Sequence, residues 1–434
     1  MSPMEKITVV GCGSVGLTTA VGLANDTRRI ICIDKDSNKL EMINNGICPY
    51  YEPELEAQLK KIMNRPSAFE TSEDFSQVDD SDVVFVCVGT PPSRDGSINL
   101  SSIKKCSRMI GLRITSSSNC PVIVIRSTVV PGTTECVVLP ILEKYSGKKA
   151  GEGFTLAANP EFLQEGKAYQ NFKNPDRVII GEYDSRAGEI LESLYAGINA
   201  PIIRTNIRTA EMIKCASNAF LGTKISFINE IGNICKKLGI DVYDVASGIG
   251  QDPRIGRDFL NAGLGFGGSC LPKDINSLIY QASSLGLDPR ILKSIYETNQ
   301  QQTDVMLELV KQRLGNLERK NITILGLTFK PDTDDTREAS AFRIIAELLL
   351  EKANIIVYDP MVSQDTEFPH SDEVTICESI TEAVNDSEGI IIVTGWDEFK
   401  DVNIYAGKTV FDGRRVLDPK QARQICLHYE GVSW

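Results

Sequence analysis

Short apolar runs alternate with longer amphipathic segments through the first two hundred residues. The apolar runs stand at residues 7–10, 30–33, 83–88, 122–125 and 178–180. Each run is followed by a Gly, Pro or Asp turn and then by a segment with helical periodicity. This alternation is typical of a parallel sheet with helices on both faces. We therefore expect residues 1–203 to form one doubly wound α/β domain.

The pattern changes near Ile207, where helical periodicity takes over. Apolar residues recur every three or four positions from Ala210 to Leu238, which predicts one long helix. A new strand-like run at 321–325 then begins a second α/β series, which continues at 355–358, 390–393 and 409–411. The sequence thus predicts an α/β protein in which two Rossmann-like doubly wound domains, 1–203 and 313–434, are joined by a central helical region at 204–312.

Composition and charge narrow the classes of function. The chain has 434 residues, 42% of them hydrophobic, and a formal net charge of -12. An excess of acidic residues argues against a nucleic-acid surface and favours small-molecule chemistry. The first apolar run is too short for a signal peptide, and no later run reaches the roughly 18 apolar residues that span a bilayer. We expect a cytoplasmic protein without a membrane partner.

The twelve cysteines are scattered through predicted strands and helices, without an export signal. Free thiols are therefore favoured over a disulfide scaffold. There is no CxxC pair or His/Cys cluster, and the two histidines, His370 and His428, both come late in the chain. We expect no metal site, and no dehydrogenase that uses histidine as its base.

A glycine signature stands between the first predicted strand and the first predicted helix. Gly11, Gly13 and Gly16 would permit a tight turn and a close approach of a pyrophosphate to the helix N-terminus. Asp34 ends the next strand, 18 residues beyond Gly16, where a carboxylate accepts from ribose hydroxyls and repels a 2'-phosphate. This favours NAD over NADP. Lys39 could lie near the adenosine ribose, although a solvated helix lysine explains it as well.

Gly89, Thr90 and Thr128 follow two further buried runs. The carboxyl ends of parallel strands share one edge, where open α/β sheets bind ligands. The threonine hydroxyls could line a nicotinamide pocket, or they could serve ordinary strand-to-helix capping.

Two pairs of polar residues are spaced by four positions. Glu161 and Glu165 would share a face of a helix; one could act as a general base and the other touch cofactor or substrate, whereas an isolated pair more often marks a solvated face. Lys214 and Asn218 lie one turn apart on a strongly apolar predicted helix. A buried lysine and amide need partners, and an oxyanion is one such partner; a lysine that reaches solvent is the alternative.

The loop at 265–274 presents Cys270 four residues before Asp274. Its glycines would let the backbone approach a ligand closely, and Lys273 and Asp274 bring charges near the thiol. A nearby cation or helix N-terminus favours the thiolate. Together with the glycine signature, this thiol suggests hydride chemistry on a covalently held substrate.

These motifs resemble, in order and across nearly the whole chain, the UDP-glucose/GDP-mannose dehydrogenase family. The matching segments are 11–16, 89–92, 127–129, 159–166, 214–218, 254–256, 265–270, 329–330 and 412–415. The resemblance implies two successive NAD-dependent oxidations at C6 of a nucleotide sugar, from a primary alcohol to a carboxylate. It also implies two α/β domains, the second of which binds the nucleotide diphosphate.

The resemblance assigns roles by position. Cys270 would trap the aldehyde as a thiohemiacetal and then carry a thioester. Lys214 and Asn218 would hold the oxyanion, Asp274 would assist proton transfer, and Thr128 and Glu161 would orient or deprotonate the hydrolytic water. Further cofactor contacts would come from Val15, Glu165, Lys273 and Arg337. Further substrate contacts would come from Phe162, Leu163, Phe266, Gly267, Phe329, Lys330, Arg414 and, from a neighbouring subunit, Arg254.

A shared Arg254 implies a homodimer built on the central helices. Segments 159–163, 216–220 and 227–231 favour the UDP-glucose branch of the family, with UDP-N-acetylhexosamine and GDP-mannose as alternative substrates. One departure is Arg126, where relatives often carry lysine; the charge is kept. Two rival interpretations are a single-step hydroxyacid dehydrogenase with a lysine base, which would need no cysteine, and a non-catalytic sensor of NAD or nucleotide sugars.

Overall fold

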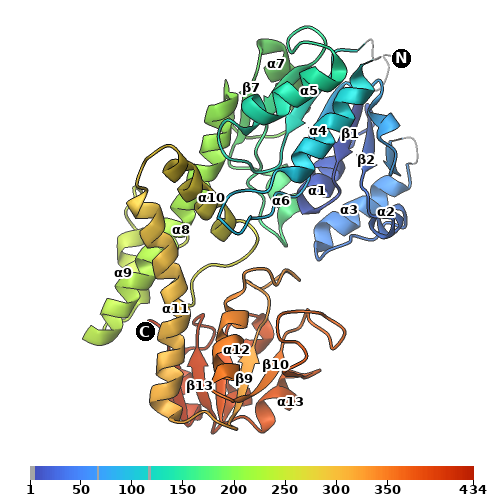
Figure 1. Cartoon of the computed structure of the whole chain (residues 1–434). Helices are drawn as coiled ribbons and strands as arrows, with labels where there is room; N and C mark the ends of the chain where they lie inside the picture. Colours follow the sequence, from blue (N-terminus) through green and yellow to red (C-terminus); the bar gives the residue numbers. More distant parts are fainter. Residues whose placement is uncertain (1–4, 66–67, 116–118) are drawn as a thin grey trace. The chain divides into compact units, whose positions relative to one another are not determined.

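The computed structural model describes residues 5–65, 68–115 and 119–434. The chain packs into two compact units, Met1–Ser217 and Asn218–Trp434, which are described separately (Figure 1). Helix α8 (Ile207–Leu238) crosses the boundary, and it confirms the long helix expected from the apolar spacing. The division into 1–203, 204–312 and 313–434 stays a prediction.

The first unit is built on an eight-stranded sheet with the order β3-β2-β1-β4-β5-β6-β7-β8. Its strands are β1 (Glu5–Val10), β2 (Arg28–Ile33), β3 (Phe69–Ser72), β4 (Val83–Val86), β5 (Val122–Ile125), β6 (Thr155–Ala158), β7 (Val178–Glu182) and β8 (Ile202–Asn206). All neighbouring strands are parallel except β6 and β7. The expectation of a parallel sheet thus fails at β7. The segment 159–177 contains only one short helix and does not cross back over the sheet, so β7 begins at the edge where β6 ends and runs antiparallel to it.

Helices cover both faces of this sheet. They are α1 (Ser14–Leu23), α2 (Ser37–Asn44), α3 (Pro53–Met63), α4 (Ser101–Ile114), α5 (Leu139–Ser146), α6 (Ala168–Lys173) and α7 (Ser185–Leu194). Because side chains alternate along a strand, Ile30 and Cys32 enter the core beneath α1, α3 and α7, whereas Ile31 and Ile33 enter the core beneath α4 and α5. The strands are apolar on both faces, as a doubly covered sheet requires.

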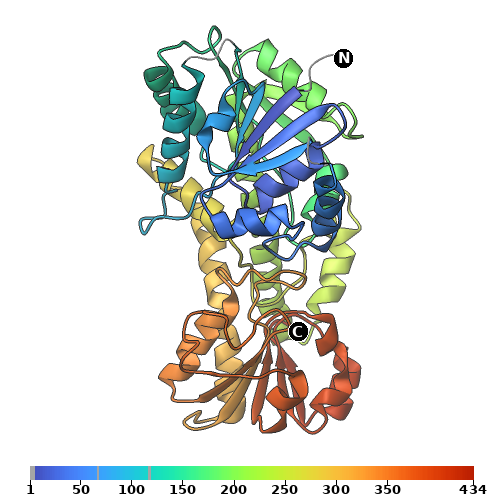
Figure 2. The same cartoon turned by 90° about the vertical axis from the view of Figure 1, so that its right-hand side faces the viewer.

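The second unit contains a six-stranded parallel sheet with the order β11-β10-β9-β12-β13-β14 (Figure 2). Its strands are β9 (Asn321–Leu325), β10 (Asn354–Tyr358), β11 (Thr375–Ile376), β12 (Gly389–Ile392), β13 (Thr409–Asp412) and β14 (His428–Gly431). This is the same winding as the first six strands of the other sheet. Both doubly wound sheets were therefore correctly expected, although the short strands β3, β6, β8, β11 and β14 were not.

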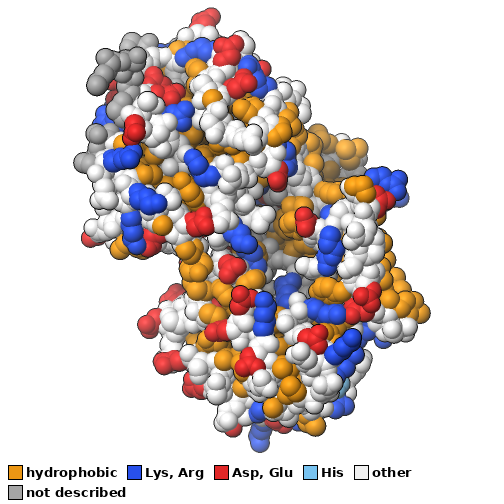
Figure 3. Space-filling model, turned by 180° about the vertical axis from the view of Figure 1, so that it is seen from behind, with side chains coloured by type: hydrophobic (Ala, Val, Ile, Leu, Met, Phe, Trp, Pro, Cys, Tyr) orange, Lys and Arg blue, Asp and Glu red, His pale blue; other side chains and the backbone are white. Residues whose placement is uncertain are grey.

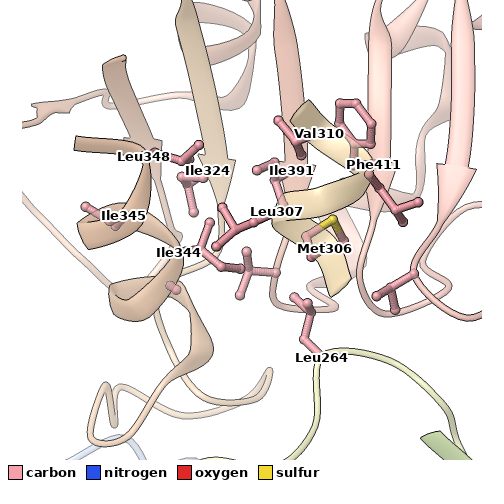
Figure 4. Packing of buried hydrophobic residues seen from close by; sticks show 14 of the residues in the cluster. Leu264, Met306, Leu307, Val310, Ile324, Ile344, Ile345, Leu348, Ile391 and Phe411 are labelled. Atoms are coloured by element: carbon pink, nitrogen blue, oxygen red, sulfur yellow. The ribbon is translucent and has the colours of Figure 1, made fainter. Parts of the chain in front are cut away.

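Helices pack on this sheet and extend beyond it. They are α9 (Val242–Gly250), α10 (Leu271–Ser284), α11 (Arg290–Leu314), α12 (Ser340–Leu350), α13 (Ile380–Asn385) and α14 (Pro419–Ile425). Figure 4 shows Met306, Leu307 and Val310 of α11 directed at the sheet residues Ile391 and Phe411. This core fixes α11 to the sheet, and α11 in turn carries residues that hold the cysteine loop.

Hydrophobic side chains also lie exposed along the helices of the second unit, at the right of the view in Figure 3. On α8 four of them, each between 50% and 67% exposed, are spaced by seven, seven and four residues: Phe220, Phe227, Ile234 and Leu238. This spacing places them on one face of the helix. Among the described helices none is both long and apolar enough to cross a membrane.

Candidate active site

The loop between β1 and α1 has the geometry of a phosphate-binding turn. Gly11 has a φ of +96°, which L side chains rarely adopt. A Cβ at Gly16 would lie 1.8 Å from the carbonyl oxygen of Gly11, so the helix can start this close to the strand only with glycine there. At Gly13, by contrast, no described atom lies within 4 Å of the place of a Cβ. Gly13 is the N-cap residue of α1, whose first N–H groups attract anions.

Asp34 follows β2 and lies beside this loop. Its Oδ2 accepts a hydrogen bond of 2.7 Å from the N–H of Cys12, and the Nζ of Lys39 lies 3.8 Å from the same oxygen. Tyr50 donates from its hydroxyl to the carbonyl oxygen of Gly13 at 3.2 Å. The structure therefore brings together the predicted glycines, the acid and the lysine, and adds Tyr50, which no sequence motif indicated.

The loops after β4 and β5 lie at the same sheet edge, as expected. The hydroxyl of Thr90 donates to the carbonyl oxygen of Thr128 at 2.9 Å, and Ser127 donates to that of Val88 at 2.7 Å. Gly89 has open space where a Cβ would stand, within the described residues. Thr90 thus ties the two loops together, and this contact is not the helix capping that was the alternative for this residue. The nicotinamide contact stays a prediction.

Glu161 is buried and forms an ion pair with Lys214 of α8, with 3.1 Å between Oε1 and Nζ. Its Oε2 accepts from the N–H of Leu163 at 2.6 Å. Residues 159–167 form a loop and not a helix, so Glu161 and Glu165 share no helical face. That conditional expectation was wrong because Pro160 and the downstream turn at 165–167 keep the chain extended.

The ionisation of Glu161 follows from its surroundings. Burial alone would raise the pKa of this carboxyl group. The positive charge of Lys214, the N–H of Leu163 and the charge of Arg126 together outweigh burial, so the pKa lies below its ordinary value. Glu161 is therefore a carboxylate at neutral pH. Lys214 lies near the Phe162 ring, 5.2 Å from its centroid, so the lysine is buried and paired and does not reach solvent.

Sequence reasoning missed Glu211, which lies on α8 three residues before Lys214. Its carboxylate accepts from the N–H groups of Gly132 at 2.6 Å and Thr134 at 2.9 Å, at the start of the helical segment after β5. Cys215 donates from its thiol to the carbonyl oxygen of Val129 at 3.5 Å. One face of α8 therefore holds the loop that carries Thr128. The only indication in the sequence was that Glu211 is an acidic residue one turn before Cys215 on a largely apolar predicted helix.

In the second unit the glycine loop is packed tightly before it reaches the thiol. A Cβ at Gly267 would lie 2.2 Å from the carbonyl oxygen of Glu338, and one at Gly268 would lie 2.8 Å from the ring of Phe329. Asn299 of α11 accepts from the N–H of Phe266 at 2.7 Å and donates to its carbonyl oxygen at 2.9 Å. The loop is thereby fixed on two sides.

Cys270 is the N-cap residue of α10, and it is exposed. The partial positive charge of a helix N-terminus favours a thiolate at this place. Asp274, in the first turn, is buried; its Oδ2 accepts from the side-chain amide of Asn218 at 2.6 Å, and Lys273 forms an ion pair with Oδ1. The thiol, the acid and the amide predicted from sequence thus lie together in this unit.

The remaining predicted residues have the following contacts. Arg414 is half-buried and donates to the carbonyl oxygens of Gly265 at 2.6 Å and Val393 at 2.8 Å; desolvation lowers its pKa to about 10. Arg337 forms a two-bond ion pair with Asp335, and the Nζ of Lys330 lies 5.7 Å from the Phe329 ring centroid. Arg254 pairs with Asp252 and is 87% exposed.

Three models of the UDP-glucose/GDP-mannose dehydrogenase family match consecutive parts of the chain. They are the NAD binding domain at residues 5–199, the central domain at 208–301 and the UDP binding domain at 323–419. The chain belongs to this family. NAD is accordingly its cofactor, in agreement with the open glycine turn and the acid of the first unit. The protein is an oxidoreductase of the nucleotide-sugar class.

Individual relatives cover the whole chain. UDP-glucose 6-dehydrogenase YwqF of Bacillus subtilis is 39% identical, over 99% of this chain and 97% of its own length. GDP-mannose 6-dehydrogenase of Pseudomonas savastanoi pv. phaseolicola is 36% identical, over 99% of this chain and 100% of its own. A UDP-glucose dehydrogenase structure from Pyrobaculum islandicum has a TM-score of 0.94 at 39% identity, covering 99% of this chain and 98% of its own.

Proposed function

We propose that the protein oxidises UDP-glucose at C6 to UDP-glucuronate, with two molecules of NAD, through a covalent adduct on Cys270. The observation that carries this proposal is the exposed thiol at the N-terminus of α10, one turn from the buried Asp274. A single-step alcohol dehydrogenase has no use for such a thiol. The relatives named for UDP-glucose, and the UDP binding domain model, support the choice of substrate.

The chemistry removes four electrons from C6 and consumes one water. The first hydride leaves C6 for NAD while the hydroxyl proton passes to solvent water, which gives an aldehyde. The Cys270 thiolate then adds to the aldehyde carbon and forms the oxyanion of a thiohemiacetal. The second hydride leaves the same carbon for a second NAD and gives a thioester. Water then bonds to the acyl carbon, the carbon–sulfur bond breaks with its electron pair on sulfur, and a water proton passes to Asp274. The adduct keeps the aldehyde aligned for the second transfer.

Other side chains would assist these reaction steps. Lys214 and Asn218, four residues apart on the continuous helix α8, would stabilise the oxyanion, and Thr128 and Glu161 would orient the water. Arg414 and Lys330 would contact the diphosphate, while the backbone of Phe162 and Leu163 would hold the sugar. Asp34 would accept from the adenosine ribose.

The first test is the amount of NADH formed per mole of limiting UDP-glucose. Two moles are expected; one mole would indicate a simple alcohol dehydrogenase. UDP-N-acetylglucosamine and GDP-mannose are run in parallel, and turnover of one of them without turnover of UDP-glucose would keep the chemistry and overturn the substrate. The Cys270→Ser variant should bind NAD with unchanged affinity and show no net turnover, and full activity in this variant would refute the covalent route.

We further propose a homodimer formed through the exposed apolar face of α8. The face made of Phe220, Phe227, Ile234 and Leu238 is unusual on a monomer surface, and the guanidinium of Arg254 extends into solvent, where a partner's site could receive it. Inactive Cys270→Ser and Arg254→Ala chains, unfolded and refolded together, test this arrangement. If Arg254 serves the partner's site, statistical mixing regenerates about a quarter of the sites; if it serves its own chain, none is regenerated.

A further inference from the structure

Arg126 is a buried cation for which the proposed reaction has no role. It follows β5 directly, and Ile125 of β5 pairs in register with Ala158 of β6. Arg126 and Asn159 are therefore the first residues beyond two adjacent strands, at the same edge of the sheet. The arginine is 4% exposed. A charge buried to this extent requires compensation by partners.

The hydrogen bonds of Arg126 go to Asn159, two residues before Glu161, and to Tyr195, which itself contacts Asn159. Its Nη1 donates to the carbonyl oxygen of Asn159 at 3.3 Å, to the side-chain oxygen of Asn159 and to the Tyr195 hydroxyl at 3.1 Å. Tyr195 also donates to the Asn159 side chain, whose amide donates to the carbonyl oxygen of Ile179 at 2.8 Å. Asn159 is thus held from three sides, two residues before Glu161.

The charges around Glu161 come from several elements. Lys214 of α8 and Arg126 after β5 are the cations, and Cys87 after β4 lies near both Glu161 and Arg126. Asp176 and Arg177, before β7, and Tyr195, after α7, line the same pocket of about 90 Å³ as Glu161. Protonation of Glu161 would remove the carboxylate that compensates the buried charges of Lys214 and Arg126, which is costly.

We propose that Arg126 is a positioning residue that fixes the segment 159–161 and keeps Glu161 a carboxylate throughout turnover. Glu161 then orients Lys214 and the hydrolytic water as an acceptor, and it takes no proton from that water. The inference rests on the proposed function, because it concerns the thioester-hydrolysis step. It assigns the proton acceptance to the other unit, where Asp274 lies beside the thiol.

The experiment compares Arg126→Met, Arg126→Lys and the matched control Arg177→Met. Arg177 lines the same pocket, but it stacks on Phe162, 4.1 Å from the ring centroid, and donates to the hydroxyl of Ser217 at 3.2 Å. Enzyme is mixed rapidly with NAD and UDP-glucose at pH values from 5 to 9. Samples are quenched with acid, and intact-protein mass spectrometry measures how much thioester adduct remains at each time. NADH absorbance reports the two hydride steps separately.

In Arg126→Met, hydrolysis should slow, most strongly at the acidic end of the range, and recover as the pH rises, because loss of a neighbouring cation raises the pKa of Glu161. The thioester should accumulate after a burst of two NADH per site. Arg126→Lys should restore a rate of hydrolysis that does not depend on pH, although the rate itself should be reduced. The lysine ammonium group keeps the positive charge but lacks the planar set of N–H donors of the guanidinium group. Arg177→Met should keep the wild-type profile. Wild-type hydrolysis in Arg126→Met, or slowing that is equal at all pH values and not rescued by lysine, would overturn the proposal.

If Arg126→Met does not fold, as judged by its melting curve and circular dichroism, Tyr195→Phe takes its place. This change removes a hydroxyl that contacts both Arg126 and Asn159. Hydrolysis several-fold slower with an unchanged pH profile is expected, and an unchanged rate would refute the positioning role. Failure of the proposed function would be evident earlier, since the wild-type enzyme would then not form two NADH from UDP-glucose or any thioester.

Discussion

The first loops of the two sheets begin alike and then differ. After β1 and after β9 a glycine adopts a positive φ, +96° at Gly11 and +98° at Gly326. In each sheet an aspartate that follows the second strand accepts hydrogen bonds from that loop, Asp34 in the first unit and Asp359 in the second. The two sheets therefore share a winding and a way of fixing the first turn.

The difference lies in what remains available to a ligand. Helix α1 starts three residues after Gly11, whereas α12 starts 14 residues after Gly326. Asp359 is 2% exposed and accepts from Leu327, Thr328, Met361 and the indole of Trp396. An acid that is this buried and already accepts from several donors inside the protein cannot bind a ribose. A doubly wound sheet alone thus does not make a dinucleotide site; an immediate helix and an available acid are needed.

The largest predicted effect concerns the two acids. Asp359→Ala leaves several buried donors without an acceptor and should lower the free energy of unfolding by about 3 kcal/mol or more. Asp34→Ala should cost about 1 kcal/mol of stability but weaken NAD binding at least tenfold. Urea unfolding followed by circular dichroism, together with titration of NAD by calorimetry, measures both. Equal stability losses would remove the distinction between a structural and a ligand-binding acid.

A smaller effect is expected at Gly13, to which Thr328 corresponds in the second unit. A methyl group at Gly13 meets open space in the protein but would stand where a pyrophosphate approaches. Gly13→Ala should therefore leave the melting temperature nearly unchanged and reduce NAD affinity about tenfold, roughly 1.4 kcal/mol. Gly197→Ala, exposed and equally unobstructed, serves as the control. Unchanged NAD affinity in Gly13→Ala would show that the open space does not receive the cofactor.

The smallest effect involves an ion pair of the second unit alone. Hydrogen bonding to Arg415 holds the pKa of Asp241 below its ordinary value. A depressed pKa adds stability above the unfolded-state value near pH 4, and this contribution disappears as the pH falls through the folded-state value. Asp241→Asn should cost at most about 1 kcal/mol at pH 7. The difference from wild type should shrink as the pH falls below about 4 in acid titrations of stability, and a difference that grows there would contradict this account.

Much of the fold could be predicted from the sequence, because doubly covered strands are apolar on both faces and stand out between amphipathic helices. The short strands could not: β3 and β8 carry polar residues at an edge, and β11 has two residues. The direction of β7 also escaped prediction, since a run such as Val178–Ile180 has no polarity of its own.

At the site, residues on recognisable turns were predictable, among them Gly11, Gly13 and Cys270. Their partners were less so. Glu161 and Lys214 are 53 positions apart and are joined only by folding. The roles of Glu211, Tyr50 and Tyr195 depend on which loop each side chain reaches, and no local pattern encodes such a contact.

The burial of the cysteines has a practical consequence for studying the enzyme in solution. Nine of the twelve thiols are buried, Cys120 is half-buried, and Cys136 and Cys270 are exposed. A maleimide added briefly to the folded protein should consequently modify two thiols first. In a Cys136→Ser background a single labelled position would remain, so the stoichiometry of the label would count competent sites, and protection of that label would report a bound sugar nucleotide without any measurement of turnover.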